Sequence, residues 1–253
     1  PRMGVAGAAV ATVVGQIGAA IVGLIVNIKC NHDIHIRREN IRWDPIVAKE
    51  IYRVGVPSII MQSISSVMTF GMNKILFVFT PTATAVFGAY FKIQSFVFMP
   101  IFGLNNGMVP IIGYNLGAQK PDRIRALCRW AIYFALALMG VGMLVFLRWP
   151  AGLLSLFGAE ALRFTGGLSA IRMIAPSFLP AAVTLVLCGF LQGLGRSSHA
   201  LVLAALRQLV FLLPAAYVLS RIGVLWLWLA FPLAELLTLP CAVLAALSSQ
   251  RHI

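Results

Sequence analysis

Residues 166–190 read GGLSAIRMIAPSFLPAAVTLVLCGF, an apolar run that contains no Asp or Glu. A helix needs about 20 mostly apolar residues to cross the hydrocarbon core of a bilayer, and this run is long enough. Further runs of comparable length and character cover 5–28, 54–80, 84–116, 127–149, 200–220 and 224–247. The sequence therefore predicts seven transmembrane helices. The run 84–116 contains Pro100 and Pro110, where we expect its helix to bend or break.

The overall composition indicates the same class of protein. Of the 253 residues, 60% are hydrophobic and 11% are charged, and the mean hydropathy is +0.92. Soluble domains are nearer half apolar and a quarter charged, so a soluble fold could not cover this much apolar surface. In a bilayer every backbone polar group must be satisfied within the protein, which favours helices. The expected fold class is all-α, a polytopic membrane helix bundle.

The net charge of +13 raises the question of nucleic-acid binding, but no basic stripe is interleaved with stacking aromatic residues. The basic residues lie mostly in loops, and one alternate set of loops is richer in them. That set holds Lys29, Arg37, Arg38, Arg42, Lys49, Arg53, Lys120, Arg123, Arg125, Arg129, Arg196 and Arg251. The other set holds Arg2, Arg148, Arg163 and Arg221. By the positive-inside rule, we expect residues 29–53 and the C-terminus in the cytoplasm and Pro1 outside. The predicted location is the cell (plasma or inner) membrane, with no nucleic-acid partner.

A weak internal repeat suggests how the spans are grouped. GVAGAAVA at 4–11 and GVLWLWLA at 223–230 share Gly-Val at the start and Ala seven positions on. Both runs open a span from the same side, six spans apart, which is typical of transporters built from two parallel six-helix lobes. The alternative is chance similarity between helix starts rich in small residues.

If the repeat marks two lobes, we expect residues 1–28 to form the last transmembrane helix of an N-terminal lobe. Residues 29–53 are then a cytoplasmic linker between lobes, and residues 54–253 are a C-terminal six-helix transporter lobe. Position 1 is Pro rather than an initiator Met, so we expect a fragment whose N-terminal lobe is missing.

No metal or cofactor site is expected. His32 and His35 form a His-x-x-His pair in the polar linker, but no Cys pair or further His completes a metal site. Cys30, Cys128, Cys188 and Cys241 are far apart in the sequence. No phosphate loop and no nucleophile–base pair is present, so a membrane-embedded enzyme is disfavoured.

Four segments resemble the multidrug and toxic compound extrusion (MATE) family. They are GVPS at 55–58, FGLNNGMVPIIGYNLGA at 102–118, LQGLGR at 191–196 and WLAFP at 228–232. The resemblance covers essentially the whole chain. The chain resembles the DinF and MepA-like bacterial members more closely than the NorM type. This resemblance implies helices six to twelve of a twelve-helix transporter, which exports small amphiphiles and organic cations and is driven by H⁺ or Na⁺.

The resemblance also bears on coupling. NorM-type members carry a membrane-embedded acid where this chain has Ser65, and the span 166–190 offers no acid either. The DinF type instead has its coupling acids in the first lobe. The implied partners are a small-molecule substrate, the lipid bilayer and the N-terminal lobe. A lipid-linked oligosaccharide flippase of the same superfamily is the alternative, although its cavity should be strongly basic.

A polar stripe follows one face of the span 54–80. It consists of Ser58, Gln62, Ser65, Ser66, Thr69 and Asn73. Polar side chains on a membrane helix face protein or water rather than lipid. We therefore take Gln62, Ser65, Thr69 and Asn73 as candidate cavity-lining residues, with helix–helix packing through small polar groups as the alternative.

The next span carries Lys92, Met99 and Asn106 along one face, and these complete the candidate cavity-lining set. Lys92 should face the lobe interior because a lysine in hydrocarbon is unfavourable. The alternative is that its amine snorkels to the headgroups.

Glu235 is the sole acid within the predicted spans. One interpretation is a titratable site that couples an ion or binds the charge of a substrate. The other is one partner of a buried ion pair. For the pair, Lys92 is the first choice of base and Arg207 the second.

Overall fold

The computed structural model describes residues 4–30, 43–79, 81–156 and 166–250. Its helices are α1 (Gly4–Cys30), α2 (Pro45–Phe77), α3 (Pro81–Gly117), α4 (Pro121–Arg148), α5 (Pro150–Leu156), α6 (Gly167–Ile174), α7 (Phe178–Gly193), α8 (Ser197–Ala205), α9 (Leu213–Ser220), α10 (Val224–Leu227) and α11 (Ala230–Gln250). A 3₁₀ turn, η3 (Ala175–Ser177), joins α6 to α7, and a π-helical turn, η4 (Leu206–Leu212), joins α8 to α9. No strand occurs in these ranges.

Seven helical segments of the described chain are long and apolar enough to cross a membrane, as predicted. They are Ala9–Cys30, Pro45–Phe77, Thr82–Gly117, Pro121–Arg148, Gly167–Gly193, Ser197–Ser220 and Val224–Gln250. The predicted all-α membrane bundle is confirmed. A break at Pro100 or Pro110 is wrong, because α3 continues through both prolines. Each proline removes only one backbone hydrogen bond, and the remaining bonds of a long helix keep it continuous.

The chain divides into two compact units, Pro1–Glu50 and Ile51–Ile253. The first holds α1 and the start of α2. Asp44 caps the N-terminus of α2, because its Oδ1 accepts hydrogen bonds from the Ile46 and Val47 amides at 2.8 and 3.4 Å. The predicted boundaries after residues 28 and 53 stay predictions. Linker residues 31–42, with His32 and His35, lie outside the described ranges.

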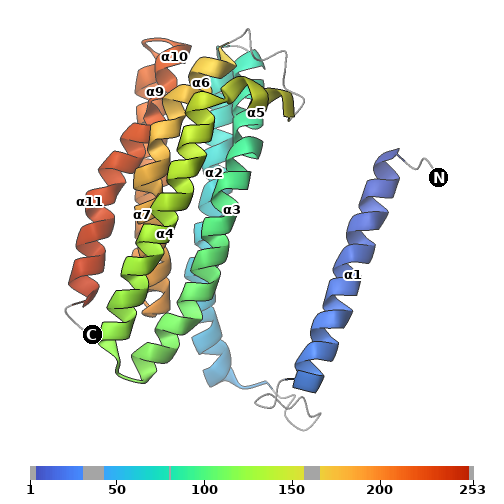
Figure 1. Cartoon of the computed structure of the whole chain (residues 1–253), viewed down its shortest axis with the longest axis vertical. Helices are drawn as coiled ribbons and strands as arrows, with labels where there is room; N and C mark the ends of the chain where they lie inside the picture. Colours follow the sequence, from blue (N-terminus) through green and yellow to red (C-terminus); the bar gives the residue numbers. More distant parts are fainter. Residues whose placement is uncertain (1–3, 31–42, 80, 157–165, 251–253) are drawn as a thin grey trace. The chain divides into compact units, whose positions relative to one another are not determined.

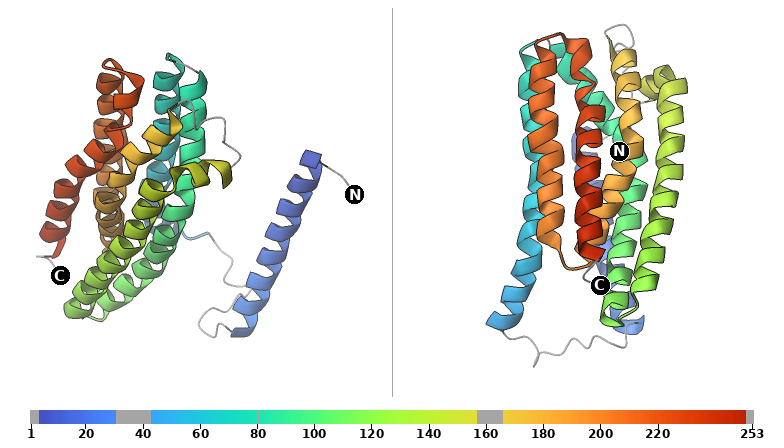
Figure 2. Two further views of the ribbon diagram at one scale, coloured as in Figure 1. Left: turned by 45° about the horizontal axis from the view of Figure 1, so that its top comes forward. Right: turned by 90° about the vertical axis from the view of Figure 1, so that its left-hand side faces the viewer.

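The second unit is a helix bundle built around α7 (Figures 1 and 2). This helix contacts α3, α4 and α11, and its span has the highest buried share of the seven. Small residues allow that close packing. A Cβ on Gly189 would come within 2.6 Å of Asn105 Oδ1 on α3, and one on Gly193 within 2.8 Å of the Ile112 side chain. The apolar core therefore follows α7.

Two proline-linked irregularities lie inside the bundle. Pro176 is in η3, at the middle of the fifth span. Pro214 lies just after η4, and it lacks the N–H that an α-helix would donate one turn back, so the preceding turn widens. The π-helical turn η4 carries Arg207 and so sets the direction of that side chain.

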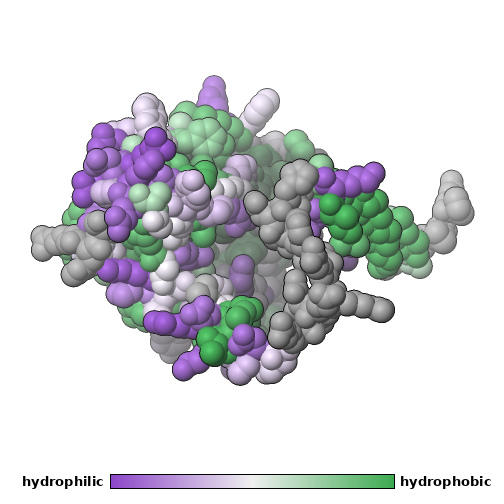
Figure 3. Space-filling view, turned by 90° about the horizontal axis from the view of Figure 1, so that it is seen from below, coloured by the Kyte–Doolittle hydropathy of each residue, from purple (hydrophilic) through white to green (hydrophobic). Residues whose placement is uncertain are grey.

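One end of the bundle is basic. The α3–α4 turn, the α7–α8 turn and the C-terminal end of α11 meet there (Figure 1), and hydrophilic side chains gather across it in Figure 3. Lys120, Arg123 and Arg125 are exposed beside the first turn. In the second turn Gly195 has φ +73°, and the Arg196 amide donates to Leu191 O at 2.9 Å. The Arg196 side chain reaches Ser249 Oγ at 3.0 Å, which ties this turn to α11.

Candidate functional site

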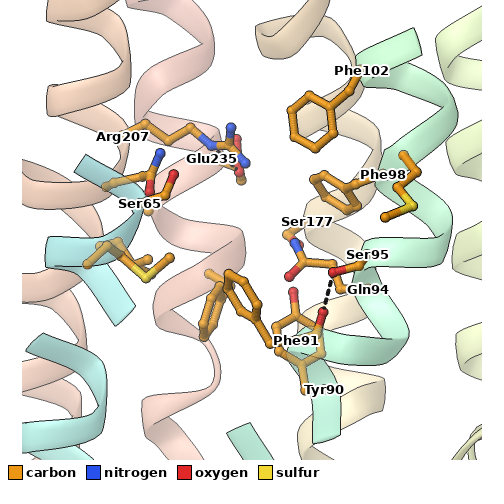
Figure 4. A pocket seen from close by; sticks show the side chains of 16 residues that line it. Ser65, Tyr90, Phe91, Gln94, Ser95, Phe98, Phe102, Ser177, Arg207 and Glu235 are labelled. Carbon is orange, nitrogen blue, oxygen red and sulfur yellow. Dashed lines mark hydrogen bonds and ion pairs between the residues drawn. The ribbon is translucent and has the colours of Figure 1, made fainter. Parts of the chain in front are cut away.

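A cavity of about 330 Å³ lies within the second unit, between α2, α3, η3, η4 and α11 (Figure 4). Its lining is mostly aromatic and aliphatic, with a few polar groups. The lining residues are Ser65, Met68, Tyr90, Phe91, Gln94, Ser95, Phe98, Met99, Phe102, Ser177, Arg207, Gln208, Leu212, Phe231, Ala234 and Glu235. Ligand sites are typically apolar cavities of this size or larger with a few placed polar groups. The cavity is therefore the candidate functional site.

An ion pair forms part of the cavity wall. Arg207 Nε donates to Glu235 Oε1 at 2.6 Å, and their side chains are 18% and 9% exposed. Arg207 comes from the π-helical turn η4 and Glu235 from α11, which pack together. In Figure 4 the pair lies on one side of the cavity, facing Phe98 and Phe102 of α3. The pair balances two charges on side chains that are mostly buried.

Two polar atoms at the cavity have no hydrogen-bond partner among the described residues. They are Glu235 Oε2 and the hydroxyl oxygen of Tyr90, both fully buried. The Tyr90 ring is held by an edge-to-face contact with Phe231, at 5.5 Å between ring centres. Buried polar groups are normally satisfied, so these two atoms mark places where a bound molecule could bond.

The base that pairs with Glu235 is Arg207, not the first choice Lys92. Lys92 is exposed and does not line the cavity. Phe91 and Phe98 face the cavity from α3, and Lys92 follows Phe91 by one residue, which turns it about 100° away around the helix. Its exposed position fits the snorkelling alternative better than the interior one.

The other predicted residues are only partly brought together. Ser65 and Met99 line the cavity, whereas Gln62, Thr69, Asn73 and Asn106 do not. Gln62 and Asn106 are exposed, and Thr69 and Asn73 are half-buried. The Thr69 hydroxyl donates within α2 to Ser65 O at 2.8 Å.

Methionines, rather than the polar stripe, form the inward face of α2. Met68 and Met72 are buried, and Met68 lines the cavity. The polar stripe is centred about 100° further around the helix, with Ser65 at the boundary between the two faces. Gln94 and Gln208 also line the cavity, and they were not predicted from the sequence. Each is an uncharged polar residue inside an apolar span, and that contrast could have identified them as cavity-lining candidates.

The helices and the cavity define a multi-pass α-helical membrane protein with a ligand-sized site between its helices. A family model described as MatE matches residues 57–218, and the chain belongs to this family. Membership places it among membrane transporters rather than enzymes.

Curated relatives include the multidrug export protein MepA of Staphylococcus saprophyticus, 24% identical over 228 residues, and that of Staphylococcus haemolyticus, 25% identical over 229 residues. The alignments cover 88% and 89% of this chain and 50% of each relative. The chain therefore spans about half the length of the curated relatives it matches.

Similar solved structures include a MOP superfamily transporter from Pyrococcus furiosus, with a TM-score of 0.90 at 19% identity. The MATE transporter VcmN of Vibrio cholerae has a TM-score of 0.87 at 22% identity. The alignments cover 98% and 100% of this chain and 57% of each of those chains. This likeness shows that the fold is the same.

Proposed function

We propose that this chain forms the C-terminal half of a secondary active antiporter in the cell membrane. The transporter exports small amphiphilic or cationic compounds in exchange for H⁺ or Na⁺. The observation that carries the proposal is the cavity between α2, α3, η3, η4 and α11, whose aromatic and methionine lining can adapt to varied apolar substrates. The relatives named as multidrug export proteins support the same activity.

The coupling step is assigned to the N-terminal lobe that the full transporter would contain. Glu235 is already engaged with Arg207 at 2.6 Å, which favours the ion-pair interpretation over a coupling acid. The family resemblance supports the same assignment, because it implies DinF-type coupling acids in the first lobe. Within this chain, the cavity then serves the substrate.

The lipid-linked oligosaccharide flippase is disfavoured by the charge of the cavity. A lipid diphosphate requires several basic groups that are free to bind its oxygens. Among the described lining residues Arg207 is the only Lys or Arg, and Glu235 neutralises it. A neutral, aromatic cavity suits an amphiphile better than a diphosphate.

Filling the cavity tests the proposal. Ser65→Phe places a benzyl ring in the cavity and should lower export by about tenfold or more, because the substrate and the ring compete for the same space. The matched control is Ser63→Phe, two residues away on the exposed side of α2, which should change export less than about twofold. Export is measured with fluorescent amphiphiles in proteoliposomes of the full transporter, under an imposed H⁺ or Na⁺ gradient. Equal loss in both variants, or in neither, would contradict the proposal.

A further inference from the structure

The charge balance of the cavity restricts which substrates it can accept. Among the described lining residues, Arg207 and Glu235 are the only ones that carry a charge, and they neutralise each other. A substrate with only a positive charge would add that charge beside the Arg207 guanidinium. Two cations would then share one carboxylate in a mostly apolar site, where like charges repel strongly. A substrate with only a negative charge meets the same difficulty at Glu235.

The same pair keeps bonding capacity for both kinds of charge. Glu235 Oε2 has no partner among the described residues, and the Tyr90 hydroxyl oxygen has none either. These two oxygens can accept hydrogen bonds from a cationic N–H group. The hydrogen bond to Glu235 uses Arg207 Nε, and a guanidinium has further donors at Nη1 and Nη2 that suit a carboxylate.

The rest of the cavity suits an aromatic body. Phe91, Phe98 and Phe102 of α3 and Phe231 of α11 line it, with Phe98 and Phe102 facing the ion pair in Figure 4. Flat rings pack well against such side chains. The charged wall and the aromatic wall thus face each other across one small space.

We infer that the cavity selects zwitterionic aromatic compounds over purely cationic ones. The cationic group of the substrate bonds to Glu235 Oε2, and its carboxylate bonds to the outer nitrogens of Arg207. Such a substrate enlarges the ion pair into a four-charge arrangement of zero net charge. The inference rests on the proposed export function and deepens it by naming the substrate class.

Rhodamine 110 and rhodamine 123 provide a matched pair of probes. The first carries a free carboxylate and is a zwitterion, and the second is its methyl ester and a cation. Fluorescence anisotropy with the purified full transporter should give a Kd about tenfold lower for rhodamine 110. Apolar partition alone predicts the opposite order, because the ester is the more hydrophobic dye.

Two variants connect the preference to the ion pair. Arg207→Gln combined with Glu235→Gln keeps hydrogen-bonding groups without charge, and it should abolish the preference for rhodamine 110. Arg172→Gln, which changes an exposed arginine of α6, should leave the preference unchanged. Equal or tighter binding of rhodamine 123 by the wild type, or a preference that survives the double substitution, would overturn the inference.

Export of the two dyes separates this inference from the function on which it rests. If proteoliposomes export rhodamine 123 and the protein binds it at least as tightly as rhodamine 110, only the zwitterion preference fails. If neither dye is exported under either gradient, the exporter function fails, and the inference fails with it.

Discussion

Glu235 and Arg207 depend on each other for their positions inside the bundle. Each is mostly buried, and an isolated charge in such a place is strongly unfavourable. Their contact at 2.6 Å gives each charge a partner of opposite sign. Removing one member therefore does more harm than removing both.

Stability measurements can test this dependence. Glu235→Gln leaves the Arg207 guanidinium without a counter-charge and should lower the free energy of unfolding by about 3 kcal/mol. Restoring neutrality with Arg207→Gln in the same chain should recover most of that loss. Thermal unfolding of the purified full transporter in lipid micelles measures both. An unchanged midpoint for Glu235→Gln would show that the pair contributes little.

The acid of this pair could be predicted from the sequence, but its base could not: Lys92 was the first choice and Arg207 the second. Glu235 is distinctive because it is the sole acid in the predicted spans. Lys92 and Arg207 were both compatible in depth, and depth alone does not fix direction around a helix. The widened turn at η4, which sets where Arg207 points, precedes Pro214, but a proline in a sequence does not say whether its helix kinks, breaks or widens.

At the scale of a helix, the rotation of α2 decides which of its residues reach the cavity. The polar stripe was visible in the sequence, and so were the methionines beside it. Periodicity shows that residues share a face, but it does not say which face turns inward. In α2 the buried face is that of Met68 and Met72, so Ser65 is the only member of the stripe that lines the cavity.

The α3–α4 crossing offers a test of close helix packing. A Cβ on Gly142 of α4 would collide with the Val97 side chain of α3, and a β-branched valine cannot easily move aside. Gly142→Ala should therefore destabilise the protein by about 1–3 kcal/mol. On the same helix, Gly140 has only Leu179 Cδ2 within reach, at 3.9 Å.

The matched substitution Gly140→Ala should stay within about 1 kcal/mol of the wild type, since alanine also favours the helix. Thermal unfolding of both variants decides the matter. Similar midpoints for the two would mean that α3 can shift to accommodate the methyl group.

At the scale of the whole molecule, the basic end of the bundle predicts its orientation in the membrane. The α3–α4 turn lies at that end and the α9–α10 turn at the other (Figure 1). By the positive-inside rule we expect the first turn to lie in the cytoplasm. Single cysteines at Ala118 and Ile222, both exposed, report the two sides when Cys30, Cys128, Cys188 and Cys241 are all replaced by Ser.

An impermeant thiol reagent added to intact cells should label Ile222→Cys and spare Ala118→Cys. Opening the cells should make both reactive, which controls for accessibility. Labelling of Ala118→Cys in intact cells would reverse the proposed topology, and with it the cytoplasmic assignment of residues 29–53.

The helix count and fold class could be predicted because hydrophobic length alone specifies a membrane span. The run 166–190 and its counterparts each satisfy that length, and the structure has a helix at each. The cavity could not be predicted in the same way. It depends on how α2, α3, η4 and α11 are rotated against one another, and its lining residues come from distant parts of the chain.

The ribosome completes Arg207 28 residues before Glu235. The span that contains Arg207 therefore enters the bilayer with an unmatched guanidinium, at a cost of about 2.5–3.5 kcal/mol on insertion scales. The surrounding apolar residues of that span must outweigh this cost until α11 is made. Arrival of the last span then neutralises the charge and closes the cavity wall at once. A chain that terminates before Ala230 would keep an unpaired arginine in the membrane, which gives the cell a physical difference between unfinished and finished copies.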